Sequence, residues 1–541
     1  MGEVEAIGAE TNPAPEDPAT GPGSRHLKTG LILTAVQAGG LVLVLGQEVL
    51  SARLFGARAK MDGYLEAWIV PNTLSMIIGM ALQDTTIPFF AKLRASDGER
   101  AAWRGAGEAT GFALSIFLAL GLPLVAGAHW VLAFTTGGAS PSARATAAIV
   151  FPIGFIVAGM GLASATIGGA LAASGRFVVV AVAANALLGV PAAVLLVAGR
   201  TLSIYSLPLG YLLAALGQLL ILSFGLRGTG FHPRLPSKAA LARMAGMLRQ
   251  TAALAIAVVP MTLIGPMERH LGAALGTGAV SHLFYASKLL SATVRLATYG
   301  MGAMSLSLMS AYLARGDIDR FRRLFRLFFA IGCYLGAAGI AVLSIEGREL
   351  IRLALERGAF GPSDSLMVAA VLRRYSWYLL YGLVFPTVSA SLLASHNAKG
   401  LILPNILGLL CYLATARWLG AQGVLGLAVA YPAAFLVSLS LSCLELLRAR
   451  VLTPGAIAWP AARAVGLGAA VAGACVAARA ASLHFGFGAA PGLTLGLLAA
   501  ALATVASLWL LDRQATAMVF QRIDQALRRR RLSEEAPTVA L

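Results

Sequence analysis

Uninterrupted apolar stretches of about 20 residues recur along this chain, from residue 30 to residue 511. Each is long enough to cross roughly 30 Å of hydrocarbon as an α-helix, which satisfies its own backbone hydrogen bonds. They lack the polar–apolar alternation of membrane β-strands. With 58% hydrophobic and 12% charged residues among 541, a water-soluble core could not hide them all. We therefore predict an all-α polytopic membrane protein with about 14 transmembrane helices.

Positive charge is distributed unevenly between the predicted loops. The formal net charge is +18, and basic residues concentrate in the loops after even-numbered spans and in the C-terminal run Arg528–Arg531. By the positive-inside rule, this predicts that both termini are cytoplasmic. Because the charge is spread over short loops between spans, we expect no nucleic-acid partner. The four cysteines lie in apolar stretches and predict neither disulfides nor a metal site.

A weak internal repeat, offset by about 220 residues, relates the two halves of the chain. Segments 64–97 and 284–317 match in polarity and spacing. Two parallel six-helix lobes would enclose a central cavity, an arrangement typical of alternating access. The predicted domains are a disordered cytoplasmic tail (1–28), an N-lobe (29–226), a cytoplasmic linker (227–249), a C-lobe (250–447), two further helices (448–512) and a basic cytoplasmic tail (513–541).

Two basic residues lie within the eighth predicted span. Lys288 and Arg295 are seven residues apart, which is two helical turns along one face. They could form a cationic cavity wall for an anionic substrate such as a pyrophosphate, or extend to a membrane interface. At the end of the seventh span, residues 268–270 (Glu, Arg, His) predict local pairing at an interface.

Several acidic residues lie in or beside the first two spans. Glu48 and Asp62 flank Arg53, and the three could form either a structural ion-pair cluster or a gate that forms and breaks. Glu66 and Asp84 could couple transport to a cation, or make structural hydrogen bonds. The sequence has no nucleotide-binding loop and no zinc motif, so we expect no enzyme activity, no cofactor and no metal.

Five short motifs lie along the chain: ARLFG at 52–56, IVPNTL at 69–74, TIPFF at 86–90, FYASKL at 284–289 and ERGAF at 356–360. Together they resemble the MurJ/MviN lipid II flippases, over nearly the whole chain. The resemblance implies two six-helix lobes around a cationic cavity, with the last two spans forming a groove for a polyprenyl tail. It also implies movement of undecaprenyl-pyrophosphate-linked peptidoglycan precursor between leaflets of the bacterial inner membrane, driven by the membrane potential or a cation gradient.

The resemblance also places individual residues. Positions at which the family has cavity arginines hold Leu41, Gln47 and Ser75, and its eighth-span arginine is Lys288 here. Arg295 has no counterpart and would replace part of the lost charge. The candidate substrate-binding residues are Lys288, Arg295, Arg53, Asp62, Gln47 and Ser75, and the candidate gating or ion-coupling residues are Glu48, Glu66 and Asp84.

Three alternatives to a lipid II flippase stay open: a flippase for another polyprenyl-linked polysaccharide precursor, a cation-coupled drug or metabolite antiporter, and a non-transporting scaffold of an envelope-synthesis complex. The expected partners are an undecaprenyl-pyrophosphate-linked saccharide, membrane lipids and cell-wall synthesis proteins.

Overall fold

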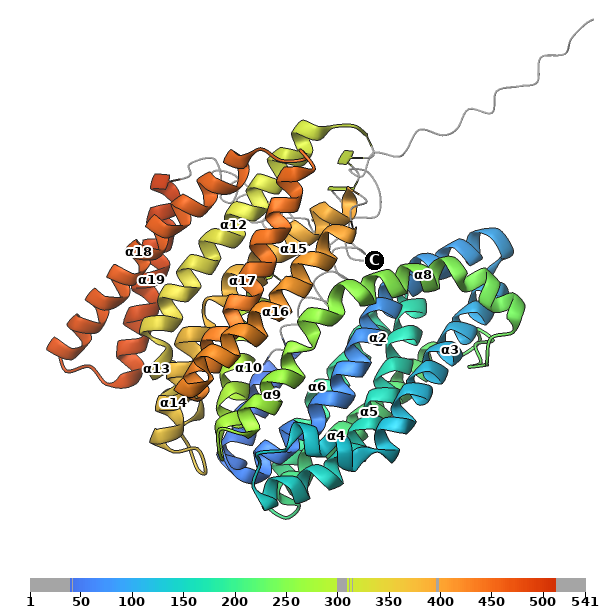
Figure 1. Cartoon of the computed structure of the whole chain (residues 1–541), viewed down its shortest axis with the longest axis horizontal. Helices are drawn as coiled ribbons and strands as arrows, with labels where there is room; N and C mark the ends of the chain where they lie inside the picture. The colour runs from blue at the N-terminus through green and yellow to red at the C-terminus, as the bar shows by residue number, and fades with distance from the viewer. Residues whose placement is uncertain are drawn as a thin grey trace, which may run out of the picture.

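The computed structural model describes residues 39–511, except residues 41, 299–308, 311, 314 and 396–397. Within these residues the chain is almost entirely helical and contains no strand (Figure 1). A helix over residues 42–55 comes first. The following α-helices are α2 (Ala59–Asp97), α3 (Glu99–Ala126), α4 (Ala128–Thr135), α5 (Pro141–Ala173), α6 (Phe177–Ala198), α7 (Ser206–Gly225), α8 (Lys238–Thr262), α9 (Ile264–Ala273), α10 (Ala279–Thr298), α12 (Ile318–Ile345), α13 (Gly347–Leu355), α14 (Pro362–Tyr375), α15 (Tyr378–Ala394), α16 (Ile402–Leu419), α17 (Val424–Arg448), α18 (Pro454–His484) and α19 (Ala489–Leu511).

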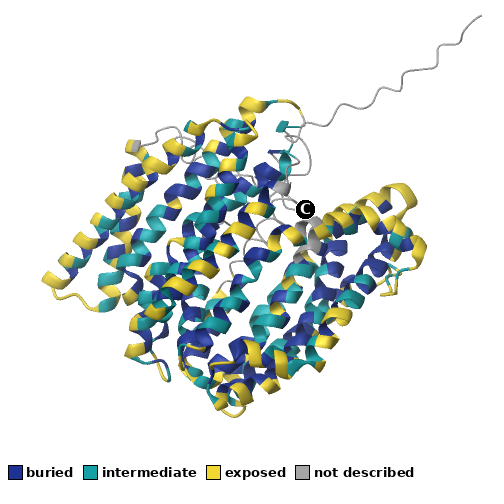
Figure 2. Ribbon diagram, viewed as in Figure 1, coloured by how far each residue is buried: buried dark blue, intermediate teal, exposed yellow. Residues whose placement is uncertain are grey.

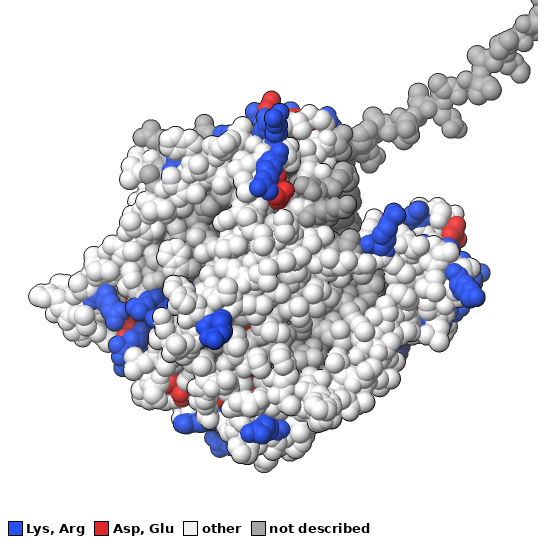
Figure 3. Space-filling model, viewed as in Figure 1, with Lys and Arg blue, Asp and Glu red and all other residues white. Residues whose placement is uncertain are grey.

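The described helices confirm the predicted all-α membrane fold. Eleven of them are long and apolar enough to span a bilayer, counting α8 with α9 and α14 with α15 as single spans. Helices α2 and α10 lie against such spans, α2 on α5 and α10 on α14 and α15. These two helices and the helix over 42–55 are not among the eleven, so the prediction of about 14 spans stays a prediction. Charged side chains gather toward two ends of the face in Figure 3, and the band between them is almost uncharged.

Local sequence signals determine where several helices begin. The hydroxyl of Ser140 accepts a hydrogen bond from the Ala143 N–H at 3.3 Å, and Pro141 occupies the first turn of α5. Asp317 caps α12 in the same way, accepting from the Arg320 N–H at 3.0 Å. Each cap gives a partner to an N–H that the first helical turn leaves unpaired.

Small residues allow helices α2 and α5 to pack closely. A Cβ atom at Gly63 of α2 would lie 2.1 Å from the carbonyl oxygen of Ala143 in α5, so only glycine fits there. Close backbone approach at small residues is a main source of helix association in membranes. Many large apolar side chains instead point outward, including Val197 (87% exposed) and Trp418 (81% exposed). The yellow outer positions in Figure 2 are consistent with a lipid-facing surface.

Helix α8 contacts both halves of the molecule. Near its start, Arg243 pairs with Glu108 of α3, with Nη2 and Oε2 3.2 Å apart, and Thr251 is hydrogen-bonded to Thr85 of α2. Further along, the Ala257 carbonyl accepts a 2.6 Å bond from the Asn405 side chain of α16. The helix begins at Lys238, after a Ser237 cap, so this span extends into the segment 227–249 that we expected to be a linker.

Candidate functional site

A small cluster of polar side chains lies deep between the first helix, α2, α7 and α10. The Lys288 ammonium of α10 is 3.4 Å from a Glu48 carboxylate oxygen and 5.1 Å from the centre of the Phe284 ring. Beside this pair, the Gln47 side-chain amide donates a 2.8 Å hydrogen bond to the Tyr211 hydroxyl. The structure therefore brings together three predicted residues from distant parts of the sequence.

These side chains surround a narrow cavity of about 50 Å³. Glu48 is 6% exposed, whereas the Lys288 side chain is 37% exposed. Aromatic rings form much of the wall, and Trp68 lies 5.1 Å from Tyr211 between ring centres. A buried carboxylate beside a more accessible ammonium is an arrangement in which an incoming anion can compete for the cation. We call Gln47, Glu48, Tyr211, Phe284 and Lys288 the central site.

Arg295 and Ser75 do not line this cavity in the described part of the chain. Arg295 lies two turns further along α10 and is exposed. The Ser75 hydroxyl donates a 3.0 Å hydrogen bond to the Ala158 carbonyl, so it connects α2 to α5. The side chain of Asp84 and the whole of Leu41 lie outside the described residues.

Asp62 belongs to α2, and its carboxylate contacts the N-terminus of α10. Its carboxylate accepts hydrogen bonds from the Gly278 N–H at 2.6 Å, the Ser281 N–H at 2.9 Å and the Ser281 hydroxyl at 2.5 Å. Gly278 precedes α10 and has no side chain to cap it, so Asp62 of α2 supplies the cap and a negative charge at the positive end of the helix dipole. Asp62 therefore binds the two halves together.

Arg53 contacts the opposite half through its main chain. Its carbonyl oxygen accepts a 2.9 Å hydrogen bond from the Ala359 N–H, whereas its side chain is exposed. Gly56 and Gly358 adopt positive φ angles of 58° and 63° where the two backbones meet. We call this set the seal: Arg53, Gly56 and Asp62, with Gly278, Ser281, Gly358 and Ala359.

Glu66, one turn beyond Asp62 on α2, lacks the hydrogen bonds that Asp62 makes. It is 1% exposed, and among the described residues neither carboxylate oxygen has a hydrogen-bond partner. Buried polar groups normally have partners because desolvation is costly. A buried carboxylate without a hydrogen bond is costly to keep charged inside a membrane bundle, so Glu66 remains a candidate for taking up a proton or meeting a cation.

The acidic and basic residues of α9 each find a different partner instead of pairing with one another. Glu268 accepts a hydrogen bond from the Tyr375 hydroxyl of α14. Arg269 donates to the Val280 carbonyl at 3.0 Å. His270 stacks on the Phe134 ring, with centres 4.3 Å apart. These contacts attach α9 to its neighbours at the same end of the molecule as the seal.

Sequence reasoning missed Tyr211, Gly278 and Ser281. Because Thr277 stands directly before Gly278, the sequence offers a local candidate for the cap of α10. It gives no signal that Asp62 would supply that cap instead.

A long apolar crevice lies on the outside of the second half, bordered by α12, α15, α17 and α18. Its volume is about 1020 Å³. Of the two C-terminal spans that the resemblance assigns to a groove, α18 contributes lining residues and α19 contributes none among the described residues.

Comparison with known proteins gives a consistent pattern. A family model described as "Lipid II flippase MurJ" matches residues 51–491. A "Probable lipid II flippase MurJ" of Bdellovibrio bacteriovorus is 25% identical over 32% of this chain and 33% of its own length. Another of Rhizobium meliloti is 25% identical over 63% of this chain and 64% of its own length. These alignments thus cover less than two thirds of each relative.

Among solved structures, "Lipid II flippase MurJ, inward closed conformation" superposes with a TM-score of 0.70. That match covers 88% of this chain and 99% of the other, at 16% sequence identity. At this identity, the likeness concerns the fold.

Proposed function

Because this chain belongs to the lipid II flippase MurJ family, we propose that it moves undecaprenyl-pyrophosphate-linked peptidoglycan precursor from the inner to the outer leaflet of the bacterial cytoplasmic membrane. It acts as a transporter, and no covalent chemistry is involved. The observation that carries this proposal is the central site, where Lys288 lies 3.4 Å from the buried Glu48.

Exchange of partners at Lys288 is the central step of the mechanism. A pyrophosphate carries more negative charge than a carboxylate and would displace Glu48 from Lys288. Lysine is a compact charge on a flexible stem, so it can follow the anion as the cavity changes shape. Arg295, exposed on the same helix, would meet the phosphate before or after Lys288. Gln47 orients the Tyr211 hydroxyl and provides a neutral wall.

Alternating access requires that one end closes while the other opens. With both termini cytoplasmic, as the loop charges predict, the seal lies on the outer side. Asp62 and the Arg53 main chain would then release α10 and the 358–359 loop when the substrate leaves. Ser75 would hold α2 and α5 together during this change through its bond to Ala158.

Energy for the cycle would come from the membrane potential or a cation gradient. Glu66 supports this because its carboxylate is buried and has no hydrogen-bond partner among the described residues. Glu48 would change partners when Lys288 binds the substrate, and Asp84 completes the set of candidate carboxylates.

The crevice beside α18 supports a polyprenyl-chain site outside the lobes. Cell-wall synthesis proteins are the expected partners at the membrane surface.

Complementation tests the proposal directly. The resident lipid II flippase of a bacterial strain is depleted, this protein is expressed, and lipid II exposed on the outer leaflet is measured. We expect the wild type and Lys92→Ala, a change at an exposed lysine at the far end of α2, to restore exposure. Lys288→Ala should lower exposure about tenfold at equal membrane level, because a charge-assisted contact is lost.

Three results would change the assignment. Full activity of Lys288→Ala would remove Lys288 from the substrate site. No restoration by a normally expressed wild type would favour another polyprenyl-linked glycan, in keeping with the neutral Gln47 and Ser75 at positions where the family has arginines. Loss of growth only when the basic loops are changed would favour the scaffold.

A further inference from the structure

A small charged pocket lies between α13 and the hairpin formed by α18 and α19. Its volume is about 150 Å³, below the roughly 300–1,000 Å³ of pockets that hold drug-sized molecules, so it fits a small group. Four charged residues line it: Glu346 directly before α13, Glu349 and Arg352 within α13, and Arg479 of α18. None of them belongs to the central site or to the seal.

The pocket lies where three membrane-spanning helices end. Helices α12 and α18 end beside it, and α19 begins there. Its lining includes the apolar side chains of Leu483 and Phe487, which are 77% and 50% exposed. Charged groups beside exposed apolar ones are typical of headgroup depth. Because α13 and the 358–359 loop both connect α12 to α14, the pocket is on the same side of the membrane as the seal.

Glu346 lacks a hydrogen-bond donor. The residue is 3% exposed, and its Oε1 atom has no hydrogen-bond partner in the described part of the chain. Gly496 of α19 leaves room for this side chain, because a Cβ atom there would lie 2.4 Å from Oε1. A buried carboxylate without a donor is costly. A ligand that brings an N–H group to Glu346 would therefore be stabilised in the pocket.

Arg479 lacks an anionic partner. Its Nη1 atom donates a 2.9 Å hydrogen bond to the Ile345 carbonyl, and it forms no ion pair with any carboxylate among the described residues, Glu346 included. The other two charged residues pair with each other, with Arg352 Nη1 3.3 Å from Glu349 Oε2. The pocket therefore presents one unpaired carboxylate and one unpaired guanidinium.

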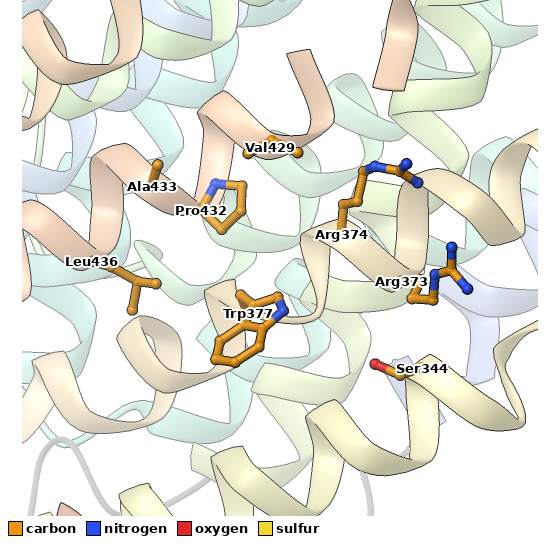
Figure 4. A pocket seen from close by; sticks show the side chains of 8 residues that line it. All are labelled: Ser344, Arg373, Arg374, Trp377, Val429, Pro432, Ala433 and Leu436. Carbon is orange, nitrogen blue, oxygen red and sulfur yellow. The ribbon is translucent and has the colours of Figure 1, made fainter. Parts of the chain in front are cut away.

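A neighbouring cavity shows why this combination is selective. Arg373 and Arg374 line a space of about 520 Å³ together with Ser344, two residues before Glu346 (Figure 4). Both charged residues among the described lining of that cavity are arginines, so it can attract any anion. The pocket at Glu346 offers charges of both signs, and it therefore favours a small group that carries both.

We propose that this pocket binds the headgroup of phosphatidylethanolamine from the leaflet on the side of the seal. The primary ammonium donates to Glu346, and the phosphate accepts from Arg479. A choline headgroup has no N–H to donate, and a glycerol headgroup carries no positive charge. The headgroup depth and the exposed Leu483 and Phe487 favour a lipid over a soluble zwitterion, because acyl chains can lie along them. A bound headgroup would hold the hairpin against α13, next to the seal.

Headgroup preference tests the proposal. Full-length protein in phosphatidylcholine nanodiscs with a small fraction of phosphatidylethanolamine or phosphatidylglycerol is analysed by native mass spectrometry. The wild type should retain phosphatidylethanolamine about tenfold more strongly than phosphatidylglycerol. Glu346→Gln should remove this preference, and Arg479→Gln should weaken retention of phosphatidylethanolamine about tenfold. Two exposed controls, Asp319→Asn at the other end of α12 and Arg373→Gln in the neighbouring cavity, should behave like the wild type.

A second pair of variants tests the pocket itself. Ala489 lines the pocket, whereas Ala490 is exposed beside it and does not. Ala489→Trp should abolish retention of phosphatidylethanolamine, and Ala490→Trp should leave it unchanged. Both variants must keep the thermal midpoint of the wild type in phosphatidylcholine alone, which separates a blocked pocket from misfolding.

Equal retention of the two lipids by the wild type would overturn the proposal, and so would an unchanged preference in Glu346→Gln. Displacement of the lipid by an equal concentration of free phosphoethanolamine would also overturn it, because the site would then take a soluble zwitterion. Equal losses of thermal midpoint in Glu346→Gln and Arg479→Gln, with or without phosphatidylethanolamine, would assign the two residues to a direct ion pair instead. None of these results depends on which molecule the protein transports.

Discussion

The seal and the central site both join the two halves of the molecule, but they use different kinds of contact. In the seal, Asp62 satisfies three donors at 2.5–2.9 Å, and two backbones meet at Arg53 and Ala359. In the central site, Lys288 and Glu48 are 3.4 Å apart beside a cavity. Directional backbone bonds form or break together, whereas a loose ion pair can exchange partners. The first arrangement suits a gate and the second a binding site.

The largest effect should follow the loss of the Asp62 carboxylate. Asp62→Ala leaves the Gly278 and Ser281 donors without their acceptor, and we expect a loss of about 3 kcal/mol in the free energy of unfolding. Reversible unfolding in mixed detergent measures it. Asp97→Ala, at the exposed far end of α2, is the control. Equal losses in the two variants would mean that the seal contributes no particular stability.

Gly358→Ala should have the next largest effect. Its φ is 63°, and a Cβ atom would lie 2.4 Å from the Arg53 carbonyl oxygen. We expect a loss of about 2 kcal/mol from strain and the separation of the two backbones. Gly361→Ala is the matched control, because that glycine has φ −92° and open space around it. A tolerated alanine at 358 would contradict a tightly packed seal.

The central pair should couple more weakly. A double-mutant cycle of Glu48→Gln and Lys288→Met should give a coupling free energy of about 1 kcal/mol, since the Lys288 side chain is 37% exposed and solvent screens the pair. The same unfolding measurement applies. A coupling as large as the loss in Asp62→Ala would remove the distinction between the two regions.

The smallest effect is expected for Arg53→Ala, because only the main chain of Arg53 contacts Ala359. The change should cost less than about 0.5 kcal/mol, as is usual for an exposed side chain. A large loss would show that the guanidinium itself takes part in the seal, as the sequence suggested.

Apolar stretches and loop charges were sufficient to predict the membrane fold, because bilayer thickness and backbone hydrogen bonding leave few alternatives. Charges in or beside the predicted spans led to Glu48, Asp62 and Lys288, which all make contacts between the halves. The partners of Asp62 could not be predicted, because they lie 216 and 219 residues away. The contact of Ser75 with α5 could not be predicted either, because the sequence does not show which neighbouring helix a single serine in a span faces.

Helix α8 restricts how the two halves of the molecule can move relative to each other during transport. One part of it is attached to α2 and α3, and the part beyond Thr251 is attached to α16. Neither half can therefore rotate as an independent rigid body unless this rod bends. Pro260 has no N–H to donate to the Ile256 carbonyl, so the helix is weakest over residues 256–260, where the contacts with α2 and α3 end and the contact with α16 begins. If the two halves move against each other as we propose, this span must bend here in every cycle. A stiffer span would therefore slow the exchange between the inward-open and outward-open states.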